Sequence, residues 1–479
     1  MCLKIAQINF QAHSFVYENI VRADGNIRLS IGEFMKLLFV SLGCDKNLVD
    51  SEEMLGLLTA NGFEIVDDET RAEVIVVNTC CFINDAKEES VNTILEMAEY
   101  KKEGTCKVLI VTGCMAQRYK NEIIEEVPEV DAVLGTTSYG DILKAVNEAM
   151  DGKHFQEFKD IDYLPEKLGK RVLTTGGHFG YLKIAEGCDK HCTYCIIPKL
   201  RGKFRSVPME RLVAQAQEMA EEGVKELILV AQETTVYGTD IYGKKSLHIL
   251  LKELCKIKGI RWIRVLYCYP EEIYDELIQT MKEEKKICHY LDLPIQHASD
   301  RILKRMGRRT TQAELVAIVN KLRQEIPDIV LRTTLITGFP GETQEDHEEL
   351  MGFVDEMEFD RLGVFTYSPE EDTPAADMPE QIPEEVKEER RDEIMELQQE
   401  ISYDKGTDRI GQELMVMIEG KVADESAYIG RTYGDAPKVD GYIFVQTGEL
   451  LMTGDFAKVR VTGALEYDLI GELADEYTE

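Results

Sequence analysis

The feature that most constrains the fold is an alternation of apolar strand-like segments with helical segments, which occurs twice along the chain. The first run covers residues 35–150. Its strand-like and helical segments follow one another in this order: 36–42, 49–59, 73–78, 85–100, 107–112, 118–126 and 132–135. Such alternation is typical of a parallel sheet flanked by helices, so the sequence predicts an N-terminal α/β domain.

The second run covers residues 179–383, after a polar stretch at 151–178 that is predicted to be a linker. It contains six strand-like segments with helical segments between them: 181–185, 226–231, 262–267, 289–293, 330–335 and 363–367. Six strand–helix repeats predict a (β/α)6 partial barrel. Its active site is then expected at the carboxyl ends of the strands.

The C-terminal part has a different pattern. Residues 384–402 are highly charged with one apolar stripe, formed by Val386, Ile394, Leu397 and Ile401, and are predicted to form a linker helix. Residues 403–479 contain short strand-like segments, broken by glycines, at 414–418, 441–445 and 457–464. This pattern predicts a small antiparallel β-barrel.

Residues 1–34 show no clear periodicity, and the first strand-like segment begins directly after Met35. We expect Met35 to be the natural start and residues 1–34 to be a non-native or disordered leader. The chain contains no run of about eighteen apolar residues, so no membrane span is predicted. It also lacks the pattern of a secretory signal, which favours a cytoplasmic protein. In that compartment, twelve cysteines indicate metal or redox chemistry rather than disulfides.

The strongest chemical signal is a loop with cysteines at 188, 192 and 195, directly after the strand-like segment 181–185. Three thiolates on one short loop can bind three irons of a cubane cluster, which leaves the fourth iron without a protein ligand. An open iron of this kind can bind S-adenosylmethionine and reduce its sulfonium. The alternative is a structural zinc site, but zinc needs four ligands and His191 lies inside the loop.

A second set of cysteines is dispersed through the first run. Cys44, Cys80 and Cys114 each follow the end of one predicted strand. Because the carboxyl ends of parallel strands meet at one edge, these three thiols are expected to bind a second cluster there. The alternative is that they are unrelated buried cysteines. Four others lie in or beside apolar segments and are interpreted as structural: Cys106, Cys255, Cys268 and Cys288.

The loop of Cys188, with Tyr194 before its last cysteine, resembles the radical S-adenosylmethionine superfamily. Two later segments, 293–297 and 334–342, are similar to strands of that superfamily which help to hold the cofactor. The resemblance implies a 4Fe-4S cluster on Cys188, Cys192 and Cys195, bound S-adenosylmethionine, and a cofactor-binding role for Tyr194.

From Met35 onward the chain resembles the methylthiotransferase family, whose members join an N-terminal cluster domain, a radical barrel and a β-barrel called TRAM. The resemblance implies two 4Fe-4S clusters, with Cys44, Cys80 and Cys114 as ligands of the second. It also implies two S-adenosylmethionine molecules, one for methyl transfer and one for the radical that activates a carbon–hydrogen bond. An external electron donor and a sulfur source would be needed.

The motifs are similar to the RimO-type branch of that family, which modifies an aspartate of small-subunit ribosomal protein twelve. The similarity is carried by residues 41–52, 78–83, 86–90 and 231–238. Two positions depart from the expected pattern: Cys81 lies beside a predicted ligand, and Glu233 stands where aspartate is expected. The other branch modifies an adenosine in transfer RNA.

Charge also separates these two substrates. The chain has a net charge of −34, and residues 403–479 hold sixteen acidic against seven basic side chains, a net of −9. RNA binding relies on cations that neutralise phosphates, whereas an acidic surface suits a basic ribosomal protein. RNA binding is therefore possible but disfavoured. The alternatives are that acidity only serves solubility and that the barrel is structural.

A small basic group, Arg201, Lys203 and Arg205, follows the cluster loop and could face RNA or cofactor carboxylates. A different class of function also remains open: an iron–sulfur electron-transfer protein without catalysis, which would not cleave S-adenosylmethionine.

Overall fold

The computed structural model describes residues 34–166, 169–423 and 425–474. The chain divides into two compact units: one runs to Gly176 and includes Ile196–Lys203, and the other comprises Gly177–Cys195 and everything from Phe204 onward. The leader expected at residues 1–34 lies, apart from Phe34, outside the described residues.

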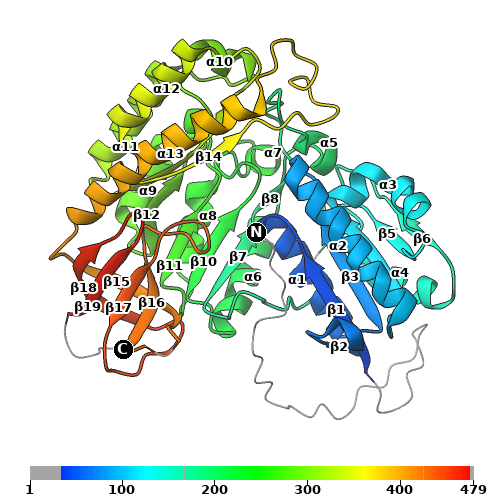
Figure 1. Ribbon diagram of the computed structural model, residues 1–479. Coiled ribbons are helices and arrows are strands. Elements are labelled where there is room, and N and C mark those ends of the chain that lie inside the picture. The colour runs from blue at the N-terminus through cyan, green and yellow to red at the C-terminus, as the bar shows by residue number, and fades with distance from the viewer. Residues whose placement is uncertain (1–33, 167–168, 424, 475–479) are drawn as a thin grey trace. The chain divides into compact units, whose positions relative to one another are not determined.

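The first unit is built on a six-stranded sheet in the order β2-β1-β3-β4-β5-β6, in which every neighbouring pair is parallel (Figure 1). Its strands are β1 (Met35–Ser41), β2 (Phe63–Ile65), β3 (Val74–Thr79), β4 (Val108–Gly113), β5 (Ala132–Leu134) and β6 (Phe155–Glu157). Its helices are α1 (Asp45–Thr59), η2 (Glu69–Arg71), α2 (Asn84–Glu103), α3 (Cys114–Glu126), η3 (Tyr139–Asp141), α4 (Ile142–Met150) and α5 (Ile197–Arg201).

Both faces of this sheet are covered, as a parallel sheet requires. Along β3, Ile75 and Val77 pack into one buried apolar cluster, and Val74 and Val76 pack into the other. This is the alternation expected for successive residues of a strand. The predicted N-terminal parallel α/β fold is therefore confirmed.

Two strands of this sheet were not predicted. β2 and β6 each have three residues with a polar residue in the run, so no apolar segment can be recognised there, unlike the equally short but fully apolar β5. β6 lies in the stretch 151–178 that was interpreted as a linker, yet it pairs with β5 through Ala132 to Leu134. That part of the linker prediction is wrong, because residues 155–157 complete the sheet.

The second unit contains another parallel sheet, in the order β14-β13-β12-β11-β10-β7. Its strands are β7 (Phe179–Lys183), β10 (Glu226–Val230), β11 (Trp262–Val265), β12 (Ile287–Asp292), β13 (Val330–Thr337) and β14 (Arg361–Thr366). A short antiparallel ribbon joins β8 (Ala185–Glu186) to β9 (Arg205–Ser206). The helices between the strands are α6 (Met209–Glu221), α7 (Thr239–Tyr242), α8 (Leu247–Cys255), η4 (Pro270–Glu272), α9 (Asp275–Glu283), α10 (Asp300–Arg305), α11 (Gln312–Glu325) and α12 (Gln344–Met357).

All six predicted strands of the partial barrel are present, in sequential order across an open sheet. Each strand follows the preceding one through a helical connection, which is the expected (β/α)6 arrangement.

A small closed barrel forms the C-terminal part, with the strand order β15-β16-β17-β19-β18. Its strands are β15 (Glu413–Lys421), β16 (Ala427–Thr432), β17 (Ile443–Gln446), β18 (Phe456–Ala464) and β19 (Leu469–Leu473). The barrel is mostly antiparallel as predicted, but β17 and β19 pair in parallel. Strand direction cannot be predicted from apolar alternation, because alternation is the same in both directions.

Helix α13 (Glu384–Thr407) contains the segment that was predicted to be a linker. The helix is confirmed, but several polar side chains are buried along it together with Ile394 and Ile401. Lys387 donates to the carbonyl of Tyr367 at 2.8 Å. Hydrophobic periodicity identified Ile394 and Ile401 on this face but not the buried polar residues, which are placed by hydrogen bonds to other segments of the unit.

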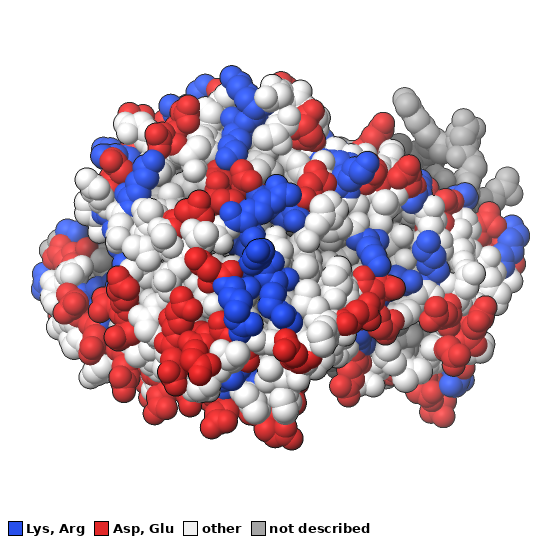
Figure 2. Space-filling view, turned by 90° about the horizontal axis from the view of Figure 1, so that it is seen from above, with Lys and Arg blue, Asp and Glu red and all other residues white. Residues whose placement is uncertain are grey.

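No helix in the described part of the chain is long and apolar enough to cross a membrane. Figure 2 shows scattered groups of acidic side chains on the face seen from above, with a group of Lys and Arg near the middle of that face.

Candidate functional site: two cysteine triads

The three cysteines of the N-terminal unit follow three neighbouring parallel strands. Cys44 follows β1, Cys80 comes directly after β3, and Cys114 comes directly after β4. Cys80 and Cys114 are buried, and Cys44 is exposed. The topology therefore brings the dispersed triad to one edge of the sheet, where parallel α/β folds place their ligands.

Glycines before two of these cysteines allow the strand ends to come close together. Gly43 has a φ of +87°, and a Cβ there would lie 2.7 Å from Cys80 Cβ and 2.9 Å from Cys80 Sγ. Gly113 has a φ of +93°, and a Cβ there would lie 2.5 Å from the carbonyl oxygen of Thr79. Both positions need the left-handed region and have no room for a side chain.

The thiols of this triad influence one another electrostatically. The pKa of Cys80 is raised to about 12, by burial first and then by the neighbouring charges of Cys114 and Cys44. Three thiolates at this edge therefore need a positive group between them, which iron supplies in a cluster. The three thiols therefore fit a cluster site with three cysteine ligands.

The strand ends are also fixed by hydrogen bonds. Ser90 on α2 accepts from the backbone N–H of Cys80 at 3.0 Å and donates to the carbonyl of Cys80 at 2.7 Å. Asn78 donates to the carbonyl of Asn47 at 2.9 Å, which connects β3 to α1. These contacts hold the backbone of Cys80 in place before any metal binds.

Cys81 belongs to the hydrophobic core of the unit and is completely buried. Burial raises the pKa of its thiol above the ordinary range. Its packing among core residues gives it a different environment from that of Cys80.

The second triad lies in the other unit, on the loop after β7 and β8. Gly187 has a φ of +80° directly before Cys188. Cys188 and Cys192 are buried, and Cys195 is partly exposed. Burial raises the pKa of Cys188 to about 11, and the charge of Cys192 contributes. These three thiols likewise fit a cluster that neutralises them.

Residues around the end of α10 support this loop. The backbone N–H of Thr193 donates to the carbonyl of Met306 at 2.9 Å, and its hydroxyl donates to the carbonyl of Arg305 at 2.9 Å. On the other side, the N–H of Ala375 donates to the carbonyl of Thr193 at 2.9 Å. The loop is therefore held on two sides.

Aromatic and basic side chains lie beside Cys192. The hydroxyl of Tyr269 is 3.7 Å from Cys192 Sγ, and the Arg308 guanidinium lies over the Tyr269 ring at 4.3 Å from its centroid. Tyr194 packs edge-on against Phe339, with the ring centroids 6.4 Å apart. Burial raises the pKa of Tyr194 well above its ordinary value. Tyr194 thus joins the cluster loop to the segment 334–342 that the sequence singled out.

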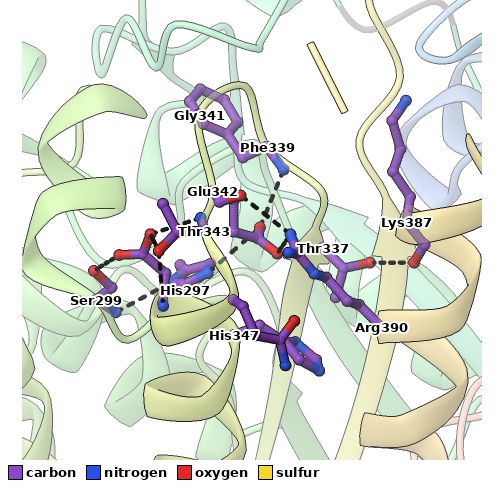
Figure 3. Close-up of polar contacts among 12 residues, drawn as sticks. His297, Ser299, Thr337, Phe339, Gly341, Glu342, Thr343, His347, Lys387 and Arg390 are labelled. Atoms are coloured by element: carbon purple, nitrogen blue, oxygen red, sulfur yellow. Dashed lines mark hydrogen bonds and ion pairs between the residues drawn. The ribbon is translucent and has the colours of Figure 1, made fainter. Parts of the chain in front are cut away.

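Figure 3 shows the polar contacts of the segments 293–297 and 334–342. Glu342 accepts from Arg390 at 2.9 Å and from the backbone N–H of Phe339 at 3.1 Å, and it lies 3.6 Å from His297 Nε2. The Nδ1 of His297 accepts from the backbone N–H of Ser299 at 3.0 Å. In the described structure these conspicuous residues therefore bind one another and the α13 helix, which fixes the ends of β12 and β13.

In the sequence Glu233 is only a departure from an expected pattern, but its environment in the structure is unusual. It follows the carboxyl end of β10 and is 1% exposed. Its Oε1 accepts from the N–H of Thr235 at 2.9 Å, whereas its Oε2 has no hydrogen-bond partner among the described residues. Burial raises the pKa of Glu233 to about 7. A buried carboxyl at a strand end, with one unpaired oxygen and a raised pKa, indicates a functional residue. A sequence pattern alone does not reveal these properties.

The three residues of the predicted basic group have different environments. Arg201 is 2% exposed and forms an ion pair with Asp50 at 2.8 Å in the first unit. Lys203 is exposed in the same unit, and Arg205 lies in β9 of the other unit. The expectation that Arg201 faces RNA or a cofactor carboxylate is therefore wrong, because a protein carboxylate already neutralises it.

No group of three His, Cys, Asp or Glu side chains in the described residues is arranged to hold a single metal ion.

Comparison with known proteins agrees with this architecture. Residues 36–135 match the family described as uncharacterized protein family UPF0004, residues 182–354 match the radical SAM superfamily, and residues 410–474 match the TRAM domain. A protein of Lachnoclostridium phytofermentans, named ribosomal protein uS12 methylthiotransferase RimO, is 65% identical over 437 residues, which is 91% of this chain and 99% of that protein. This chain belongs to the RimO family of methylthiotransferases.

Other RimO proteins show the same full-length similarity. The protein with that name from Desulforamulus reducens is 51% identical over 91% of this chain and 98% of its own length. The one from Clostridium perfringens is 53% identical over 92% of this chain and 98% of its own length.

Solved structures share the fold at low sequence identity. The radical S-adenosylmethionine methyltransferase TsrM from Kitasatospora setae has a TM-score of 0.52 and 13% identity, over 72% of this chain and 77% of that one. The cobalamin-dependent radical enzyme OxsB has a TM-score of 0.50 and 14% identity, over 77% of this chain and 56% of that one. These likenesses concern the fold. As a member of the RimO family, the chain is a radical SAM transferase.

Proposed function

We propose that this chain transfers a methylthio group to the β-carbon of an aspartate in ribosomal protein uS12. The observation that carries the proposal is the identity of 65% with a protein named as a uS12 methylthiotransferase, over nearly its whole length. The two cysteine triads at strand ends support it, since the reaction needs both a radical site and a sulfur site.

Two 4Fe-4S clusters and S-adenosylmethionine are the cofactors of the proposed reaction. Cys188, Cys192 and Cys195 would hold the cluster that supplies an electron for cleavage of S-adenosylmethionine, and Cys44, Cys80 and Cys114 would hold the one that supplies a binding place for sulfur. The buried strand ends of Cys80 and Cys114 keep water away from their thiolates. Tyr194 is proposed to contribute to cofactor binding through its place on the loop.

Glu233 is proposed to receive the cationic part of S-adenosylmethionine. Its Oε2 is unpaired in the described structure and its carboxyl is almost fully buried. A buried carboxylate is stable only when a positive group compensates it, and S-adenosylmethionine carries an ammonium and a sulfonium. Lys190, whose charge also lowers the pKa of Glu233, is already bound to Glu272.

The protein substrate is favoured over transfer RNA by charge. The C-terminal barrel region has a net charge of −9, which suits a basic ribosomal protein and repels phosphates. A cytoplasmic location follows from this substrate. An external electron donor and a sulfur source complete the proposed reaction.

A first experiment tests the radical chemistry. The protein is reconstituted anaerobically with iron and sulfide, reduced with dithionite and incubated with S-adenosylmethionine, and 5′-deoxyadenosine is measured. We expect product from the unchanged protein and background from Cys188→Ala. Equal background in both would overturn the enzymatic function and favour an electron-transfer protein.

A second experiment tests the substrate. The gene is deleted in its host, and intact uS12 and the nucleosides of transfer RNA are analysed by mass spectrometry. We expect loss of the methylthio group from uS12 and unchanged nucleosides. Loss from transfer RNA with unchanged uS12 would assign the other branch.

A further inference from the structure

Arg201 has a position that its ion pair with Asp50 does not by itself explain. It ends the short helix α5, within the segment Ile196–Lys203 that belongs to the N-terminal unit. Ile196 and Leu200 of this segment pack into the hydrophobic core of that unit. The segment that follows Cys195 thus places the buried guanidinium of Arg201 at the strand ends that carry the N-terminal cysteine triad.

The two terminal nitrogens of Arg201 have different partners. NH1 donates to Asp50 Oδ2 at 2.8 Å, and NH2 donates to Asn47 Oδ1 at 2.9 Å and to Cys114 Sγ at 3.4 Å. The last distance suits a hydrogen bond to sulfur, which is a larger acceptor than oxygen. Arg201 therefore contacts one of the three thiols of the triad directly.

Asn47 extends this contact to the other two strand ends. Its Nδ2 donates to the carbonyl of Leu42, after β1, at 2.7 Å and to the carbonyl of Thr79, at the end of β3, at 3.3 Å. Arg201 and Asn47 together thus connect the backbone before Cys44, the backbone before Cys80 and the thiol of Cys114. A structural ion pair would need only Asp50, whereas this arrangement reaches all three ligand positions.

We propose that Arg201 is a positioning residue of the N-terminal cluster: its N–H donor fixes the Cys114 thiolate and raises the reduction potential of the cluster. The inference rests on the proposed role of Cys44, Cys80 and Cys114 as cluster ligands. Hydrogen bonds and positive charge at the sulfurs favour the reduced state, which carries more negative charge. Asp50 opposes this effect by neutralising part of the guanidinium charge.

The test measures the midpoint potential of the N-terminal cluster in a protein that cannot form the cluster on the loop of Cys188. In a protein with Cys188→Ala, Cys192→Ala and Cys195→Ala, reconstituted anaerobically, iron is counted and the midpoint potential is determined by redox titration followed by electron paramagnetic resonance. Arg201→Met and Arg201→Lys are compared in this background. Lys199→Met is the control, because it removes an exposed cation from the same helix.

We expect Arg201→Met to shift the midpoint to more negative potential, Arg201→Lys to give a smaller shift, and Lys199→Met to leave it unchanged. Asp50→Asn should shift it in the opposite direction, because the guanidinium charge is then less neutralised. If Arg201 and Asp50 formed a merely structural ion pair, the two substitutions would not shift the midpoint potential in opposite directions. Asp50→Asn also keeps the shape of the side chain, so it remains informative if Arg201→Met fails to fold.

The two proposals fail in different ways. If the protein lacking the three loop cysteines binds no iron, the second cluster of the proposed function is wrong. If it binds about four irons and neither Arg201→Lys nor Asp50→Asn changes the midpoint, the cluster exists and the role of Arg201 is overturned.

Discussion

Glu226 and Arg431 form a fully buried ion pair between β10 of the parallel sheet and β16 of the C-terminal barrel. Glu226 Oε2 accepts from Arg431 NH2 at 2.7 Å, and its Oε1 accepts from Arg264 Nε at 2.8 Å. Although burial raises the pKa of Glu226, the charges of Arg431 and Arg264 lower it overall. One carboxylate thus neutralises part of two buried guanidinium charges where the barrel meets the sheet.

The first prediction concerns this pair. Glu226→Gln removes the carboxylate that pairs with buried Arg264 and leaves Arg431 with Glu419 alone, so we expect a loss of about 3–5 kcal/mol in the free energy of unfolding. Denaturant titration of the full-length protein measures the loss. Glu413→Gln is the control, since Glu413 pairs with Lys458 and Arg460 at the surface and should matter little. Equal stability of both variants would contradict the prediction.

The second prediction concerns the approach of the strand ends. Gly113→Ala places a Cβ 2.5 Å from the Thr79 carbonyl oxygen at a φ of +93°, so the backbone beside Cys114 must move. We expect the protein lacking the radical-loop cysteines to retain much less iron after Gly113→Ala. Gly152→Ala is a matched control, because Gly152 has a φ of +76° and no atom within 4 Å of its Cβ position. Similar iron retention in both variants would show that close approach is not needed.

The third prediction separates two adjacent cysteines. Cys80→Ala should abolish the N-terminal cluster, because Cys80 lies against Gly43, directly before Cys44, whereas the side chain of Cys81 is completely buried in the core. Cys81→Ala should keep the cluster, at some cost in stability from the cavity in the core. Iron counts and thermal unfolding of both variants measure the two effects. If Cys80→Ala retained the cluster and Cys81→Ala lost it, the prediction would be wrong and Cys81 would be the ligand.

Much of the fold could be predicted from sequence because its strands are long and almost fully apolar. β3 and β4, for example, are buried at every residue and therefore lack a polar alternation. The dispersed triad could be proposed because each cysteine follows such a strand. The three-residue strands β2 and β6 could not be predicted, since each is short and carries polar, partly exposed residues, whereas the equally short β5 is fully apolar and buried.

The polar contacts around the sites could not be predicted in the same way. Arg201 and Asp50 are far apart in the sequence, and their ion pair depends on which unit the segment after Cys195 joins. Lys387 and Arg390 lie on a strongly charged helix, yet both are buried against acceptors of other segments. Periodicity describes apolar faces, whereas these side chains are placed by tertiary contacts.

The last prediction follows from the pKa of Glu233, which burial raises from 4.5 to about 7 in the absence of ligand. Between these values the folded protein holds a proton that the unfolded chain has lost, so stability falls as pH rises through this window. Above pH 7 the full cost remains, about 3–4 kcal/mol for the shift from 4.5 to about 7 at 1.4 kcal/mol per pKa unit.

Glu233→Gln removes this cost, because the amide does not ionise. In protein without clusters and without S-adenosylmethionine, we expect the variant to gain stability relative to the unchanged protein at pH 8 and the difference to shrink toward pH 5. Denaturant titrations at both pH values measure it. The same variant should bind S-adenosylmethionine more weakly, since the unpaired Oε2 no longer offers a negative charge to the cofactor. If the stability difference between Glu233→Gln and the unchanged protein were the same at both pH values, the Glu233 carboxyl would already be ionised in the folded protein. A cationic ligand would then not be needed to stabilise its charge.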